Sequence, residues 1–366
     1  MKKFAWLFTL MLVLTLVLSA CGTPAAPTTQ APAATEPPAQ PTEAPATEAP
    51  TEAATEAPAA TEAPAGELFR VAVVMPSAIN DLAFSQSMYD ALVRVQEEMG
   101  KENFEFVYSE GMFVVDDAAA AIRDYASQGF NLVIAHGSQY GSSLQEIAPD
   151  FPETSFAWGT TVDTFGLDNI FAYEARSEQG GFVNGVMAAG LSKSNVIGVV
   201  GPIETGDAKL YVDGFKAGVT SVKPDAQVNV NYIGSFSDVA LASEAATTHI
   251  SAGADVLTGT AQMVVGAIGK AEENNVWWFG TQSNQASLAP SIVVASQVYH
   301  WEGILKEMIS LIKSGTLGGQ SFQATLENGG EVIEFNPDSA VAADAETLAQ
   351  ETIQGIIGGS IEIPLP

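Results

Sequence analysis

Short apolar runs alternate with segments of helical spacing along most of the chain, from residue 67 to residue 366. This alternation constrains the fold most strongly, because strands that are apolar on both faces form parallel sheets covered by helices. The helical spacing is clearest in an apolar stripe that begins at Phe84 and returns every three or four residues up to Met99. The runs assigned to strands are Phe69–Met75, Phe104–Tyr108, Asn131–Ala135, Ser155–Trp158, Val196–Val200, Val228–Ile233, Asp255–Leu257, Val276–Phe279 and Ile292–Ala295.

The number of runs favours two lobes over one. About ten strands are many for a single sheet, and a segment of this length exceeds the usual size of one hydrophobic core. We therefore expect two doubly wound α/β lobes. Ligands of such sheets bind beyond the carboxyl ends of the strands, so the loops that follow the strands hold the candidate site residues.

These loops are rich in hydroxyls, carboxamides and aromatic rings, which suits a neutral polar ligand that contains a ring. The first loop carries Asp81, Phe84 and Ser85 at a helix start, where Asp81 either caps the helix or accepts a hydrogen bond from a ligand. Trp158 lies at a strand end, although core packing would explain it equally well. The remaining candidates are His136, Gly137, Ser138, Tyr140, Gly259, Gln262, Gln282, Tyr299 and Trp301.

Composition removes several classes of function. The formal net charge of −29 speaks against nucleic-acid binding and against electrostatic docking to anionic lipid, since both rely on Lys and Arg. A single cysteine and three scattered histidines argue against a metal site, and we expect no cofactor. There is no G-x-S-x-G elbow and no P-loop, so we expect no enzyme, although the sequence leaves a spatially assembled pair of carboxylates open.

The first residues have the pattern of a targeting signal. Two lysines precede an apolar stretch that is too short to span a bilayer comfortably. The stretch ends in Leu18-Ser19-Ala20-Cys21, which resembles the lipobox of bacterial lipoproteins. The resemblance implies a signal peptide over residues 1–20 and a lipid-modified Cys21, and hence an extracytoplasmic protein anchored to the cell membrane. The alternative is a coincidental cysteine in an uncleaved signal anchor.

Residues 22–66 are a low-complexity segment of Pro, Ala, Thr and Glu without aromatic or large aliphatic side chains. Such a segment cannot bury enough apolar surface to offset the entropy lost on ordering. We therefore expect this segment to be disordered and, together with the Cys21 that the lipobox resemblance implies is lipidated, to act as a tether over residues 21–66.

Several stretches of residues 69–335 carry, in order, a family resemblance. They are Asn80–Ser87, Gly180–Ala189, Asp213–Gly218, Tyr232–Asp238, Gly253–Val256 and Gly280–Pro290. Together they resemble the basic membrane protein family of lipoproteins, the nucleoside-binding branch of the type I periplasmic binding proteins.

The resemblance implies two Rossmann-like lobes joined by three crossovers, with the ligand in the cleft between them. Lobe one would hold residues 67–174 and 297–316, and lobe two residues 175–296 and 317–366. The implied function is capture of a purine nucleoside, or a related small ring-containing molecule, for the permease and ATPase of an ABC importer. The protein would act as a monomer. In the family, the residues that fall on Asp81, Phe84 and Ser85 contact the ligand.

The chain departs from the family where the ribose is held. The carboxylate that grips the ribose falls on Gln282, a second on Asn284, and a lysine on Tyr299. A carboxamide accepts hydrogen bonds more weakly than a carboxylate. We therefore expect a ligand that keeps an aromatic or purine-like ring but need not carry the usual ribose. A sensor lipoprotein of the same fold that binds a sugar or an autoinducer remains the alternative.

Overall fold

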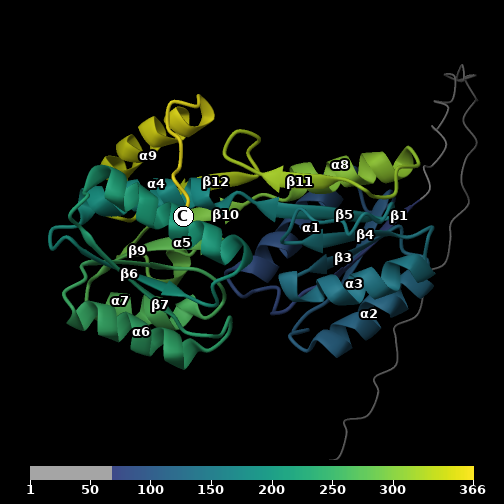
Figure 1. The fold of residues 1–366 in the computed structure, drawn as a ribbon, viewed down its shortest axis with the longest axis horizontal. Helices are drawn as coiled ribbons and strands as arrows, with labels where there is room; N and C mark the ends of the chain where they lie inside the picture. The colour runs from purple at the N-terminus through teal and green to yellow at the C-terminus, as the bar shows by residue number, and fades with distance from the viewer. Residues whose placement is uncertain (1–67) are drawn as a thin grey trace, which may run out of the picture. The chain divides into compact units, whose positions relative to one another are not determined.

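The computed structural model describes residues 68–366, which fold into two α/β lobes (Figure 1). The six-stranded sheet of lobe one has the strand order β11-β5-β4-β3-β1-β2, and that of lobe two has the order β12-β10-β9-β8-β6-β7. Both orders are doubly wound, so the predicted fold class is confirmed. The predicted signal peptide, the lipidated Cys21 and the tether lie outside the described residues.

The strands pair in parallel, except that β12 runs antiparallel to β10. Lobe one contains β1 (Phe69–Val74), β2 (Phe104–Ser109), β3 (Leu132–His136), β4 (Ser155–Gly159), β5 (Ile170–Ala175) and β11 (Ser321–Ala324). Lobe two contains β6 (Val196–Gly201), β7 (Gln227–Tyr232), β8 (Val256–Gly259), β9 (Trp277–Gln282), β10 (Val293–Tyr299) and β12 (Glu331–Phe335). The predicted runs did not include β5, β11 or β12.

Helices cover both faces of each sheet and enclose two apolar cores per lobe. In lobe one, α1 and α8 pack on one face, and α2 and α3 on the other. In lobe two, α4, α5 and α9 pack on one face, and α6 and α7 on the other. The bounds are α1 (Phe84–Met99), α2 (Val115–Ser127), α3 (Gly141–Ile147), α4 (Ser177–Leu191), α5 (Gly206–Val222), α6 (Val239–Ser251), α7 (Val264–Glu273), α8 (Glu302–Lys313) and α9 (Ala342–Ile357).

Helix α5 packs unusually closely against α4, and glycine makes this possible. A Cβ atom at Gly185 would overlap the carbonyl oxygen of Phe215, and one at Gly218 would overlap that of Phe182. The stretches Gly180–Ala189 and Asp213–Gly218 therefore serve helix packing rather than ligand contact. This packing also fixes the first turn of α5, which borders the space between the lobes.

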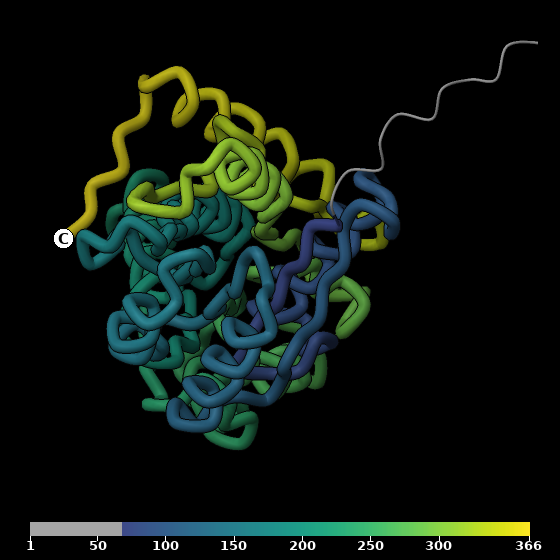
Figure 2. The backbone as a smooth tube through the Cα atoms, turned by 90° about the vertical axis from the view of Figure 1, so that its right-hand side faces the viewer, coloured from purple at the N-terminus to yellow at the C-terminus, as the bar shows by residue number. Residues whose placement is uncertain are grey.

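The chain passes between the lobes three times: after β5, after β10, and between β11 and β12. Two positions differ from the predicted lobe boundaries. All of β10 pairs within lobe two, so the return to lobe one comes after residue 299 rather than at 297. Strand β11 pairs with β5, so residues 321–324 lie in lobe one. Figure 2 shows α8, in yellow-green, and α9, in yellow, on the same side of the molecule.

Candidate functional site

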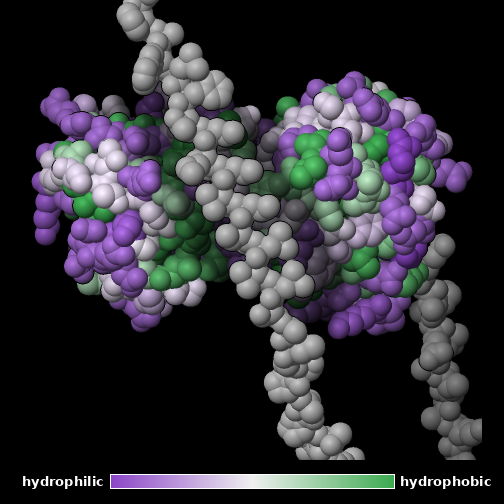
Figure 3. Space-filling view, turned by 90° about the horizontal axis from the view of Figure 1, so that it is seen from below, coloured by the Kyte–Doolittle hydropathy of each residue, from purple (hydrophilic) through white to green (hydrophobic). Residues whose placement is uncertain are grey.

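A cavity of about 220 Å³ lies between the lobes, at the carboxyl ends of the strands. Segments that follow β1, β2, β3 and β4 form its wall in lobe one, and segments that follow β6, β7 and β8, together with the last residue of β9, form its wall in lobe two. In Figure 3 apolar side chains gather on the part of lobe two that borders the space between the lobes. The lining residues are Pro76, Phe84, Phe113, Val115, Gly137, Ser138, Gln139, Thr160, Asp207, Ala208, Phe236, Ala261, Gln262 and Gln282.

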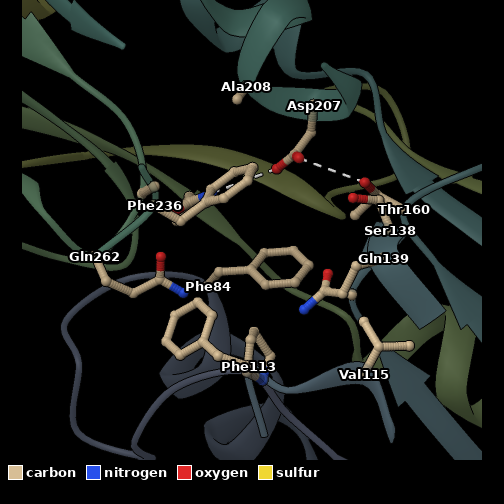
Figure 4. A pocket seen from close by; sticks show the side chains of 14 residues that line it. Phe84, Phe113, Val115, Ser138, Gln139, Thr160, Asp207, Ala208, Phe236 and Gln262 are labelled. Carbon is tan, nitrogen blue, oxygen red and sulfur yellow. Dashed lines mark hydrogen bonds between the residues drawn. The ribbon is translucent and has the colours of Figure 1, made fainter. Parts of the chain in front are cut away.

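One part of the cavity is aromatic. The side chains of Phe84, Phe113 and Phe236 line it together, and Figure 4 shows their rings in the same region of the cavity. A planar ring placed there would gain stacked or edge-to-face contacts in addition to apolar burial.

The ring of Phe84 is held from behind by His136. Their centroids are 3.8 Å apart and their planes differ by 7°. Nε2 of His136 donates to the carbonyl oxygen of Phe84 at 3.0 Å, and Nδ1 accepts from the hydroxyl of Tyr173 at 2.7 Å. Burial lowers the pKa of His136 to about 3, so the imidazole is neutral. His136 therefore supports Phe84, and it does not line the cavity as predicted.

The polar part of the cavity centres on Asp207, in the first turn of α5. Its Oδ2 accepts from the hydroxyl of Tyr299 at 3.0 Å and from Nε2 of Gln282 at 3.4 Å, and its Oδ1 accepts from Oγ1 of Thr160 at 3.4 Å. Burial raises the pKa of Asp207, against the opposite effect of these hydrogen bonds. Among the lining residues within 68–366, Asp207 carries the sole charge.

Hydrogen bonds across the cleft hold the two lobes together around the cavity. Nε2 of Gln262 donates to Oγ of Ser77 at 2.9 Å, and Oγ of Ser283 donates to the carbonyl oxygen of Ala83 at 2.8 Å. Both join lobe two to the loop after β1. These hydrogen bonds hold the lobes in contact beside the cavity, as in a closed form of a two-lobed binding protein.

The backbone at the cleft is unusual for residues other than glycine. Leu82, Ala261 and Gln282 have φ angles of 51°, 78° and 68°. L-residues rarely adopt this left-handed region, and such strain clusters at binding sites. Ala261, after β8, and Gln282, the last residue of β9, line the cavity, and Leu82 lies in the loop that follows β1.

The structure resolves the two interpretations of Asp81. Its carboxylate accepts hydrogen bonds from the backbone N–H groups of Ala83, at 2.9 Å, Ser85, at 3.2 Å, and Gln86, at 3.1 Å, and from the hydroxyl of Ser77. These four donors, three of them at the start of α1, use all of the acceptor capacity of the Asp81 carboxylate. Asp81 does not line the cavity, and neither does Ser85, whose hydroxyl contacts Ser77 at 2.7 Å.

Four aromatic residues that were predicted to contact the ligand do not line the cavity. They are Tyr140, Trp158, Tyr299 and Trp301. Tyr140 is buried, and its hydroxyl donates to the carbonyl oxygen of Met112 at 2.7 Å. Trp158 stacks on Phe165 and supports the loop at Gly137 through a 3.2 Å hydrogen bond.

The other two lie near the crossover after β10. Trp301 is fully buried in lobe one and donates to Oγ of Ser87 at 3.0 Å. Tyr299 reaches the cavity only through Asp207, because its ring is buried and its hydroxyl also contacts Ser177 at 2.7 Å. These rings pack inside lobe one or behind the cavity wall, and none lines the cavity.

Gly259 is likewise a packing position, since a Cβ there would lie 2.7 Å from the carbonyl oxygen of Val200. The predicted residues that do line the cavity are Phe84, Gly137, Ser138, Gln262 and Gln282. Sequence reasoning missed Phe113, Gln139, Thr160, Asp207 and Phe236. Gln139, Thr160 and Phe236 lie in loops after strands, which the sequence had indicated as the place of the site. The sequence offered no spacing or motif that distinguished Asp207 from the other acidic residues.

Two general properties concern the described residues alone. Within residues 68–366, no group of three or more histidine, cysteine, aspartate or glutamate side chains is placed to hold a metal ion. Over the same range, no helix has both the length and the apolar character needed to cross a membrane.

Comparisons with known proteins agree with this fold. A family model described as "ABC transporter substrate-binding protein PnrA-like" (Bmp) matches residues 68–365. A transcriptional activator protein of Bacillus subtilis is 27% identical over 271 residues, which cover 74% of this chain and 82% of that protein. A purine-binding protein of Brucella abortus is 26% identical over 299 residues, covering 82% and 84%.

A solved ABC transporter solute-binding protein from Aeropyrum pernix has the same fold. It superposes with a TM-score of 0.70 at 19% identity, and the match covers 81% of this chain and 94% of that one. The family resemblance predicted from the motifs is confirmed, because the family model spans nearly all of the described residues. The chain belongs to the Bmp family of PnrA-like substrate-binding proteins of ABC transporters.

Proposed function

We propose that this chain captures a purine nucleoside, or a related small ring-containing molecule, and delivers it to the permease and ATPase of an ABC importer. The observation that carries the proposal is the cavity itself, which three phenyl rings and three carboxamides line together. Rings stack on an aromatic heterocycle, and carboxamides both donate to and accept from the polar edge of a base. The name of the Brucella abortus relative, a purine-binding protein, supports the same class of ligand.

The electrostatics of the cavity favour an uncharged or cationic ligand. The described lining has no Lys or Arg side chain, and its one charge is the carboxylate of Asp207. A phosphate group would therefore be desolvated beside a negative charge, without a compensating cation. We infer that nucleosides bind in preference to nucleotides.

The attachment of the protein to the membrane is a further part of the proposal. We infer that Cys21 carries a lipid anchor and that residues 21–66 tether the binding domain outside the cell membrane, where it acts as a monomer. No catalytic step is proposed. The support is the sequence alone: a basic start, an apolar stretch and the tetrad Leu18-Ser19-Ala20-Cys21. A Cys21→Ala variant that still incorporates labelled fatty acid in cells would contradict the anchor.

The ligand is tested on the full-length chain, purified in detergent. Isothermal titration calorimetry compares adenosine, guanosine and inosine with their 5′-monophosphates, and with glucose and ribose. We expect at least one nucleoside to bind and its monophosphate to bind at least tenfold more weakly. Binding of a sugar with no binding of any nucleoside would overturn the proposal in favour of the sugar-binding alternative.

A further inference from the structure

A fully buried carboxyl group lies where the three crossovers between the lobes meet. Glu331 opens β12, directly after the third crossover, and it pairs with Tyr299, the last residue of β10, just before the second crossover. Its Oε1 accepts hydrogen bonds from the backbone N–H of Gly180, at 3.1 Å, and from Nε2 of Gln297 in β10. Gly180 lies near the start of α4, which follows the first crossover. One side chain therefore joins all three connections.

Two oxygen atoms of this contact have no partner. Oε2 of Glu331 and Oε1 of Gln297 are buried, and neither has a hydrogen-bond partner among the described residues. Both side chains are 0% exposed. The packing is also tight, since a Cβ at Gly180 would lie 2.4 Å from Cγ of Gln297 and 2.5 Å from Oε1 of Glu331. An ionised glutamate here would thus leave two buried acceptors unsatisfied, which costs free energy.

The titratable groups around this carboxyl leave it without a cation of its own among the described residues. On the α4 side, Arg176 pairs with Glu178 at 2.5 Å, and the side chain of Glu178 is 1% exposed. On β10 and α5 lie the phenol groups of Tyr299 and Tyr211, whose pKa values burial raises. On β12 itself, the partly exposed Glu334 pairs with a histidine of the second crossover.

These surroundings favour the neutral acid. Burial raises the pKa of Glu331 well above its ordinary value of 4.5, and the charge of Glu178 acts in the same direction. A protonated carboxyl group is also a hydrogen-bond donor. While its carbonyl oxygen accepts from the amide group of Gln297, its O–H can donate to the amide oxygen of the same residue. One proton on Oε2 would therefore satisfy both unpartnered oxygens.

We infer that Glu331 is held as the neutral acid, that its proton donates to Gln297, and that this proton-dependent contact holds the three crossovers together until the proton is lost. Ionisation leaves an unpaired negative charge between β10, β12 and α4, so the crossovers, which act as the hinge of a two-lobed protein, should loosen. The contact reaches the cavity through Tyr299, whose hydroxyl lies 2.7 Å from that of Ser177 and donates to Asp207. The inference does not depend on the ligand proposed above.

A bound cation is the competing use of the unpartnered oxygens. With Oε2 of Glu178, which also lacks a partner among the described residues, Glu331 and Gln297 would offer three oxygen ligands at most. Ca²⁺ takes about six to eight oxygen ligands. A proton needs only the contact that Glu331 and Gln297 already make, so the observations favour the proton.

The first experiment detects the proton in the full-length chain, purified in detergent. Glu331→Gln replaces the neutral acid by a carboxamide of the same shape that still donates. Infrared difference spectroscopy at neutral pH, unaltered chain minus variant, should show the carbonyl band of a protonated carboxylic acid. The matched control Glu327→Gln removes an exposed acid of the third crossover and should leave this band in place. In Gln297→Met the band should persist at higher frequency, because the acid loses its amide partner.

The second experiment follows the contact between about pH 5 and pH 9. A raised pKa in the folded chain means that the proton stabilises the fold at low pH, and that this stability is lost as the pH rises from 4.5 toward the raised pKa. In urea, the unfolding equilibrium constant of the unaltered chain should rise relative to that of Glu331→Gln by up to about tenfold per pH unit. Hydrogen exchange of an α4 peptide that contains Gly180 should become faster in the unaltered chain than in Glu331→Gln, compared at each pH.

The outcomes decide each part of the inference. Absence of the difference band, with a ratio of unfolding constants that does not change with pH, overturns the neutral acid. A band whose frequency Gln297→Met does not change overturns the pairing with Gln297, and this comparison stands even if Glu331→Gln does not fold. Exchange at Gly180 that is equal in the two chains at every pH overturns the role in holding the crossovers. Stabilisation by calcium chloride of the unaltered chain, but not of Glu331→Gln, overturns the proton in favour of a cation.

Discussion

Asp81 and Asp207 occupy equivalent places in the two lobes but have opposite surroundings. Each follows the first strand of its lobe and lies at the start of the next helix, Asp81 before α1 and Asp207 in the first turn of α5. Asp81 is saturated by one hydroxyl and three backbone N–H groups of its own segment. Asp207 accepts side-chain hydrogen bonds only from other segments, at distances up to 3.4 Å.

This difference shows what distinguishes a structural acid from a ligand-binding acid. Position after a strand does not decide it, because both residues share that position. The two acids differ in where their donors come from and in whether the carboxylate lines the cavity. Asp81 is bound mainly by the backbone of its own segment and lies off the cavity, whereas Asp207 is bound by side chains of other segments and lines a cavity whose described residues include no cation.

The largest expected effect is on stability. Asp81→Ala should lower the free energy of unfolding by about 3 kcal/mol, because it removes charge-assisted hydrogen bonds that cap α1. Asp207→Ala should leave stability unchanged or raise it, since burying an unpaired carboxylate costs free energy. Thermal unfolding of both variants measures the contrast. An equal loss of stability in the two would remove the distinction between them.

A smaller effect concerns ligand affinity on the aromatic side. Phe236→Ala should weaken nucleoside binding by about 1–3 kcal/mol, because a stacking surface is lost. Calorimetry measures the change. The matched control is Phe165→Ala, which removes a ring that stacks on Trp158 outside the cavity lining and should not alter affinity. If both variants bind normally, the phenyl rings do not hold the ligand.

The two acids should also differ in how pH affects binding. The pKa of Asp207 is raised above its ordinary value of 3.8 by burial, and a ligand that donates a hydrogen bond to this carboxylate would require its ionised form. Affinity should therefore be full near neutral pH and fall as the pH drops through this raised pKa, by up to about tenfold per pH unit.

The control for this pH dependence is Asp207→Asn, which should show no such fall. Tyr299 faces Asp207 but has a pKa well above 10.0, and His136, behind Phe84, has a pKa of about 3, so neither titrates near neutral pH. A fall of the same size in Asp207→Asn would assign the pH dependence to another group, such as Asp81, whose pKa burial also raises.

The smallest effect is expected at Thr160. Thr160→Val removes the 3.4 Å hydrogen bond to Asp207 that joins lobe one to lobe two, while keeping the shape of the side chain. A bond this long contributes little, so nucleoside affinity should change by less than about 1 kcal/mol. A loss as large as that of Asp207→Asn would show that Thr160 itself binds the ligand.

The sequence predicted the fold well because local patterns encode it. The apolar stripe from Phe84 to Met99 became α1 with the same ends, and the β-branched runs became buried parallel strands. Strand β11 was missed because its four residues, half of them polar, carry too little pattern. Its pairing with β5 is a contact between segments more than a hundred residues apart.

The site was predicted less well than the fold. Residues in strand-end loops, such as Phe84, Ser138 and Gln262, were found because parallel sheets gather their carboxyl ends. His136, Trp158 and Trp301 lie in or near those loops, but their side chains turn into the layers behind the cavity. Which way a side chain turns depends on packing against distant residues, and spacing does not contain that information.

By itself, the sequence determined the two-lobed α/β architecture, the family and the edge of the sheets at which a ligand binds, because periodicity and motif order are properties of the chain. Only the tertiary structure decided which acid lines the cavity. In the sequence, Gln282 stands at a position where the family resemblance leads us to expect a carboxylate, and Asp207 is one of 43 acidic residues. The end of β9 and the first turn of α5 meet in lobe two and bring the two side chains within 3.4 Å of each other, and a hydrogen-bond acceptor is defined by where it lies in space rather than by its place in the chain.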